Sequence, residues 1–249
     1  MNQRIDYDRL SATYDEGRAF PEAWLRGWRE ATAQYVADLT GPVLDLGSGT
    51  GIWALLLARW FDVEVVGVEP SSGMRAEALS KRFHPRVKYV AGRAEELPMA
   101  DGVCAAVWIS TVVHYFTNAR VAAREVRRVL KPDGPVLIRS AFSGRHEGVP
   151  WMPFFPSARS LADRRHPSLE ATLDAFSAAG FARESLTSVS QVTASSLDDY
   201  VRRVATRTDS TLALISDEEF ERGLADLKRA ARHEPPAPVL TTLDLLVLR

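Results

Sequence analysis

The chain has 249 residues, of which 46% are hydrophobic and 25% charged, and its formal net charge is −1. This composition is typical of a folded globular protein and excludes global disorder. The balanced charge offers no basic field to a polyanion, so we expect no nucleic-acid partner. The sequence also predicts no secretory signal and no membrane span. A single cysteine, Cys104, excludes an intrachain disulfide, and we expect a soluble, cytoplasmic protein.

Hydrophobic periodicity predicts an amphipathic helix over residues 21–39, followed by short apolar runs that alternate with helical segments. The expected elements are a strand at 43–46, a helix at 52–61, a strand at 63–68, a helix at 71–82, strands at 87–90 and 103–109, a helix at 119–130 and a strand at 136–138. Such alternation is typical of βαβ units that form a parallel sheet. The sequence therefore predicts a doubly wound α/β fold.

Residues 142–168 interrupt this pattern with four prolines and four large aromatic residues. A flexible linker is rarely so aromatic, so we expect the segment to pack on the rest of the protein. Beyond it, the sequence predicts a helix at 168–179, a strand at 181–192, helices near 197–207 and 217–232, and a last strand at 243–249. A capping box of Ser216 and Glu219 begins the last helix.

The most informative segment is the glycine-rich stretch 47–51, between the first predicted strand and its helix. It is either an ordinary tight turn or a loop that a ligand can approach closely. The dinucleotide-binding fingerprint requires a sixth-position glycine, where this chain has Ile52. Asp45 would repel a pyrophosphate but suits an amine, and Glu69 can accept hydrogen bonds from both hydroxyls of a ribose. These residues predict a ligand with a ribose and an amine, which disfavours a dinucleotide oxidoreductase.

Four segments together resemble the class I S-adenosylmethionine-dependent methyltransferases that act on small molecules: DLGSGTG, VVGVEPS, YVAGRAEELPMADG and REVRRVLKPDGPVLI. The resemblance covers about residues 6–141. It implies a Rossmann-like, mostly parallel sheet of seven strands with helices on both faces, methyltransferase activity, and S-adenosyl-L-methionine as cofactor. It also implies a set of cofactor-binding residues: Tyr14, Arg18, Asp45, Gly47, Ser48, Gly49, Glu69, Pro70, Met74, Arg93, Ala94, Glu95 and Ser110.

By this resemblance, residues 47–49 line the methionine moiety, Glu69 binds the ribose, and Ala94 offers its backbone N–H to adenine. The third motif departs from the usual Gly-Asp-Ala, because Arg93 stands where the family has an aspartate. Arginine cannot accept a hydrogen bond from the adenine amino group. Glu95 or a backbone carbonyl is expected to accept it instead.

An N-terminal pair, Tyr14 and Asp15, resembles one that folds over the cofactor in this family. Arg18 then either pairs with the methionine carboxylate or remains a solvated helix charge. We expect one domain, consisting of an N-terminal helical cap at 1–40, a cofactor-binding core at 41–141 and substrate-covering insertions at 142–168 and 196–236.

Two histidines are candidates for a general base. His114 follows the fourth predicted strand, where this fold binds substrates, and its ordinary pKa lies near 6.5. The alternative is a histidine that only packs at the start of a helix. His146 is the second candidate, with a plain surface loop as the alternative. No carboxylate–histidine cluster has metal-ligand spacing, so we expect no metal.

A small organic molecule, methylated at O, N or C, is the expected substrate. The residues at 108–111 do not form the Asn/Asp-Pro-Pro-aromatic run of enzymes that methylate DNA adenine or protein glutamine. Trp151, Phe154 and Phe155 either line the substrate pocket or seal the core, and the covering insertions are either mobile or rigid. Other candidate functions are a protein or tRNA methyltransferase and a cofactor-binding, non-methylating, cyclase-like protein. The sequence leaves the oligomeric state open.

Overall fold

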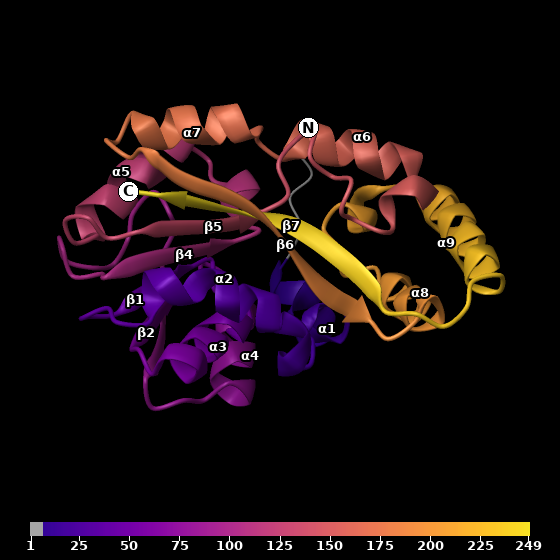
Figure 1. The fold of residues 1–249 in the computed structure, drawn as a ribbon, viewed down its shortest axis with the longest axis horizontal. Helices are drawn as coiled ribbons and strands as arrows, with labels where there is room; N and C mark the ends of the chain where they lie inside the picture. The colour runs from indigo at the N-terminus through magenta and orange to yellow at the C-terminus, as the bar shows by residue number, and fades with distance from the viewer. Residues whose placement is uncertain (1–6) are drawn as a thin grey trace.

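The computed structural model describes residues 7–249, and its sheet has seven strands in the order β3-β2-β1-β4-β5-β7-β6 (Figure 1). Strands β1 to β5 pair in parallel, whereas β7 runs antiparallel to both β5 and β6. The strands are β1 (Val43–Leu46), β2 (Val65–Val68), β3 (Val87–Val90), β4 (Ala106–Ser110), β5 (Val136–Ser140), β6 (Arg183–Ala194) and β7 (Val239–Leu248). The predicted doubly wound, mostly parallel sheet is confirmed.

The helices are α1 (Tyr7–Arg18), α2 (Arg26–Val36), α3 (Ile52–Phe61), α4 (Ser72–Lys81), α5 (Ala119–Val129), α6 (Pro156–Arg165), α7 (Leu169–Ser177), α8 (Leu197–Ala205) and α9 (Asp217–Ala231). Short 3-10 helices are η1 (Glu22–Leu25), η2 (Val113–Tyr115), η3 (Met152–Phe154) and η4 (Leu212–Leu214). Two expectations were incomplete, since the helix expected at 21–39 is divided into η1 and α2, and α1 and α6 were not predicted. None of the described helices is long and apolar enough to cross a membrane.

Alternating side chains give the sheet two apolar faces. Leu44 and Leu46 of β1 belong to the core shared with α5 and α7, whereas Val43 belongs to the core shared with α2 and α3. Asp45 lies on the second face, in register with Trp108 of β4. The alternation therefore buries an acidic side chain at the end of the first strand.

The long strands β6 and β7 continue past the other strands, and α6, α8 and α9 gather around their projecting part (Figure 1). Trp151 and Phe155 are buried there in a third apolar cluster, together with residues of α8 and α9. Half of the capping box is formed, since Ser216 Oγ accepts from the Glu219 N–H at 3.2 Å. The Glu219 carboxylate instead accepts from the Ser157 N–H at 2.9 Å, which joins α9 to α6.

We predict that Gly223→Ala loosens this projecting part. A Cβ at Gly223 would overlap the Phe155 ring and lie 2.6 Å from the Phe154 carbonyl oxygen. Overpacking of this kind costs about 1–3 kcal/mol and should exceed the gain in helix propensity. Hydrogen exchange should accelerate at 197–231 and stay unchanged at 43–68. The exposed Lys228→Ala, which also introduces alanine into α9 but at the solvent face, is the control, and a more stable Gly223→Ala protein would contradict the prediction.

Candidate functional site

The glycine-rich loop, residues 47–51, connects β1 to α3. Its three glycines have φ angles of 73°, 54° and 81°, a region that favours glycine. A Cβ at Gly47 or Gly51 would collide with a neighbouring side chain. A Cβ at Gly49 would meet nothing within 4 Å. The loop is thus open at Gly49, where it lines a cavity of about 80 Å³.

Asp45 lies at the end of β1 and is 1% exposed. Burial raises its pKa to about 8, while the Ala54 N–H lowers this pKa and the Glu69 carboxylate raises it. Its Oδ2 atom has no hydrogen-bond partner among the described residues. Because an unpartnered buried acceptor is costly, Asp45 is suited to accept from the amine of a ligand.

Glu69 follows β2, and two backbone groups orient its carboxylate. The Gly49 N–H donates to Oε2 at 3.0 Å, and the Ser71 N–H donates to Oε1 at 2.9 Å. Burial raises the pKa of Glu69 against the effect of these hydrogen bonds. A carboxylate oxygen can accept more than one hydrogen bond, so both oxygens keep capacity for hydroxyl donors.

Helix α1 is fastened to the glycine-rich loop by Asp15. Its carboxylate accepts from Thr50 Oγ1 at 2.6 Å and pairs with Arg82 at 2.7 Å. This attachment places Tyr14 and Arg18 against the cavity beside the loop and also against a second, larger cavity. The N-terminal helix therefore closes one side of both cavities.

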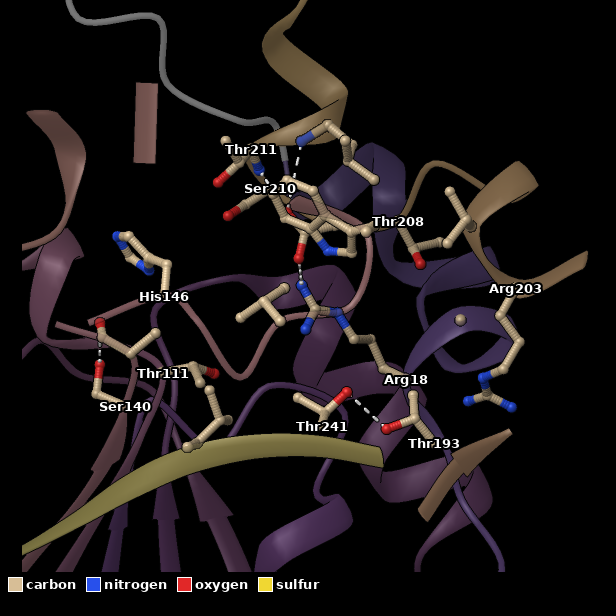
Figure 2. Close-up of a pocket in the computed structure, with 18 of the residues that line it drawn as sticks. Arg18, Thr111, Ser140, His146, Thr193, Arg203, Thr208, Ser210, Thr211 and Thr241 are labelled. Carbon is tan, nitrogen blue, oxygen red and sulfur yellow. Dashed lines mark hydrogen bonds and ion pairs between the residues drawn. The ribbon is translucent and has the colours of Figure 1, made fainter. Parts of the chain in front are cut away.

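Arg18, expected to pair with a methionine carboxylate or with solvent, is instead bound to Asp209. Its Nη2 atom lies 3.0 Å from Asp209 Oδ2, a residue between α8 and η4. Burial disfavours the charged guanidinium, but Asp209 keeps the pKa of Arg18 above its usual value. Figure 2 shows Arg18 extending into the larger cavity toward this partner.

The third motif lies apart from both cavities. Glu95 Oε1 accepts from Thr117 N at 2.6 Å and from Asn118 N at 3.2 Å, so it is engaged with the chain itself. Burial raises the pKa of Glu95, but these hydrogen bonds hold it below the ordinary value. The Arg93 side chain is largely exposed, and Ala94 is buried in the core.

The remaining predicted residues have different environments. Met74 is buried, Pro70 is exposed and accepts from Arg75 through its carbonyl oxygen at 3.0 Å, and Ser48 Oγ is buried without a partner among the described residues. Ser110 lies at the end of β4 and lines the smaller cavity. Ser48 and Ser110 thus lie with Asp45 and Glu69 at the carboxyl ends of the central strands.

Sequence reasoning missed Thr111, which lines both cavities. Its φ of 54° is unusual for a β-branched residue. The surrounding structure holds it there, because its N–H donates to the Arg139 carbonyl at 2.7 Å. Strained residues of this kind cluster at functional sites. No local sequence signal marks the position, since threonine is common in ordinary turns.

Arg139 was also missed. It is 8% exposed on β5 and lines both cavities. Its guanidinium donates to Ser110 Oγ at 3.2 Å and to Gln191 Oε1 at 2.9 Å. The same group lies over the rings of Trp28 and Trp53, at 4.7 and 4.9 Å from their centroids. Burial lowers the pKa of Arg139 to about 9, so it stays charged at neutral pH.

The larger cavity, of about 160 Å³, is bordered by α1, by β5 to β7, and by η3, α8 and η4, which we call the projecting segments (Figure 2). Three histidines line it: the His114 and His166 ring centroids are 4.5 Å apart, and those of His146 and His166 are 5.3 Å apart. His146 is 1% exposed, so the plain surface loop considered for it is wrong. Trp151 also lines this cavity, whereas Phe155 is enclosed in the third cluster.

All three histidines are held in their neutral form. Burial lowers the pKa of His114 well below its usual value, and His166 and two arginines lower it further. Burial also lowers the pKa of His146, although Asp163 raises it, and lowers that of His166 to about 4. Within residues 7–249, no group of His, Cys, Asp or Glu has the arrangement needed to hold a metal ion.

Comparisons with known proteins agree with this geometry. Residues 44–138 match the family model described as a methyltransferase domain. The chain is 39% identical over 130 residues to a demethylmenaquinone methyltransferase of Beutenbergia cavernae, covering 52% of this chain and 51% of that protein. Residues 44–138 therefore match a methyltransferase domain, the region that these relatives share with the chain. The chain spans about half the length of the curated relatives that it matches first.

Solved structures share the fold of this protein. A protein described as a methyltransferase of an antibiotic biosynthesis pathway in Anabaena variabilis has a TM-score of 0.70 at 20% identity, covering 89% of this chain and 96% of that one. The [4+2]-cyclase SpnF has a TM-score of 0.63 at 21% identity, covering 98% and 93%. At such identities the likeness concerns the fold alone.

We predict that Asp45→Asn stabilises the ligand-free protein increasingly as pH rises from 5 to 8. The folded-state pKa of about 8 exceeds the unfolded value near 4, so folding loses stability as pH rises through this window. The free energy of unfolding falls by at most about 1.4 kcal/mol per pH unit, and asparagine, which does not titrate, removes this loss. Thermal unfolding from pH 5 to 8 measures the gain, with the exposed Asp38→Asn as control. A gain independent of pH would contradict the prediction.

Proposed function

We propose that this protein transfers a methyl group from S-adenosyl-L-methionine to an O, N or C atom of a small organic molecule. The observation that carries the proposal is that two adjacent cavities share lining residues. These are Tyr14, Arg18, Thr111 and Arg139, among others. One cavity lies beside the glycine-rich loop and the other beneath the projecting segments. A donor in the first would face an acceptor in the second.

The glycine-rich loop and the two acids beside it fit this cofactor. Asp45 has an unpartnered buried oxygen for an amine, Glu69 has acceptor capacity for ribose hydroxyls, and Gly49 leaves its side of the loop open. When bound, the cofactor supplies an electrophilic methyl group on a sulfonium. Asp45 would repel a diphosphate and Ile52 replaces the sixth-position glycine of the dinucleotide fingerprint, which keeps a dinucleotide as the weaker alternative.

The larger cavity supplies acceptor chemistry. The His114 imidazole is neutral, and neither ring nitrogen has a hydrogen-bond partner among the described residues. It can therefore take a proton from an acceptor O–H or N–H as the new bond to carbon forms. The projecting segments would exclude water from this reaction, as lids do in other enzymes.

The direct experiment incubates the purified protein with labelled S-adenosylmethionine and metabolite, protein and tRNA fractions. Label in a small metabolite is the expected result. Label only in protein or tRNA would favour the second candidate, and cofactor binding without transfer to any fraction would favour a non-methylating role.

We predict that Glu69→Ala lowers affinity for S-adenosylhomocysteine about 10- to 150-fold. Hydrogen bonds to a charged group are worth about 1.5–3 kcal/mol, which converts to this range. Titration calorimetry on the folded variant measures the loss. The exposed Glu64→Ala removes a carboxylate at the other end of β2 and should bind normally. Equal affinities for wild type and Glu69→Ala would refute the ribose assignment.

Once an acceptor is found, we predict that His114→Gln lowers kcat about 100-fold or more and leaves S-adenosylhomocysteine affinity unchanged. Because the pKa of His114 is well below 6.5, wild-type kcat should stay level from pH 8 to 6.5. His146→Gln, in the same cavity, is the matched comparison. If His146→Gln alone reduces kcat, the role of base belongs to His146.

A further inference from the structure

The guanidinium of Arg139 is a buried cation whose direct contacts are all neutral. It contacts a hydroxyl, an amide oxygen and two tryptophan rings, through Ser110, Gln191, Trp28 and Trp53. Among the described side chains, no carboxylate forms an ion pair with it, whereas Arg18 and Arg145 each pair with one. A buried charge without a counter-ion is costly, so this arrangement needs a functional reason.

The larger cavity as a whole carries excess positive charge. Arg18, Arg139 and Arg203 line it, and Asp209 is the only carboxylate among the described lining residues. Asp209 is already paired with Arg18. Burial lowers the pKa of all three histidines, so they do not add to the excess at neutral pH.

The proposed cofactor would increase this excess, because its sulfonium and ammonium outnumber its one carboxylate. An acceptor that carried an anionic group would offset it. Guanidinium recognises carboxylates through two parallel hydrogen bonds, and a desolvated site strengthens such a pair. Each Nη atom of Arg139 has one partner among the described residues and a second N–H, so the guanidinium keeps donors for a ligand in the cavity that it lines.

We propose that Arg139 binds a carboxylate on the acceptor substrate, so that the substrate class is an organic acid. This assignment rests on the proposed function for the identity of the larger cavity as the acceptor site. The cofactor has a carboxylate too, so the test must separate the two sources.

The decisive variant is Gln191→Glu, which puts a carboxylate beside the guanidinium. Gln191 Oε1 accepts from Trp28 Nε1 at 2.8 Å and from Arg139 at 2.9 Å, and a glutamate oxygen can accept both. We therefore expect a folded protein with a thermal midpoint at or above that of wild type. Gln34→Glu makes the same change on the exposed side of α2 and serves as control.

Calorimetry would compare benzoate with its neutral isostere benzamide, with and without S-adenosylhomocysteine. In wild type and Gln34→Glu, benzoate should bind at least tenfold more tightly than benzamide. In Gln191→Glu, this preference should disappear. Equal binding of the two probes to wild type, or a preference that survives in Gln191→Glu, would overturn the proposal.

A second arm compares S-adenosylhomocysteine with 5′-methylthioadenosine, which lacks the amino-acid carboxylate. Gln191→Glu should bind both as wild type does. If it loses affinity for S-adenosylhomocysteine alone, Arg139 holds the cofactor carboxylate and the proposal is overturned. Failure of wild type to bind S-adenosylhomocysteine would refute the proposed function. The titration of benzoate in the absence of S-adenosylhomocysteine would still test whether Arg139 binds a carboxylate.

Discussion

The site depends on the parallel pairing of β1 with both β2 and β4. This pairing sets Asp45 in register with Gly67 on one side and Trp108 on the other, so three strands end at one edge of the sheet. Ligands of open α/β sheets bind at such an edge, where the strand order reverses direction. Glu69 and Ser110 reach the glycine-rich loop only because the register brings their strands to the same level.

Acidic and basic side chains are buried close to this edge. Asp45 and Glu69 lie at the carboxyl ends of β1 and β2, and Arg18 and Arg139 line both cavities. Burial raises the pKa of both acids and lowers that of Arg139, so each is held at a cost to folding. Sites that bind charged ligands commonly carry this cost, because stability and function compete for the same residues.

Local patterns in the sequence were enough to predict the alternating strands and helices, and the resemblance of four motifs to a known family supplied the seven-stranded sheet. The loop at 47–51 and its two acids were also recognisable, because their spacing lies within one βαβ unit. Contacts between distant segments were beyond reach. Arg18 meets Asp209 across 191 positions and Arg139 meets Gln191 across 52, and only the packed fold shows either pair. His146 likewise resembled a surface-loop residue, and only the packed fold shows that its side chain is buried.

The position of β7 has a consequence for the order of assembly. This last strand lies between β5 and β6, and edge strand β6 has no other partner in the sheet. During synthesis, residues up to 238 can emerge without forming that part of the wall of the larger cavity. The parallel half of the sheet consists of segments that are complete much earlier. Completion of the cavity therefore waits for pairing between distant segments, which is slow relative to local folding.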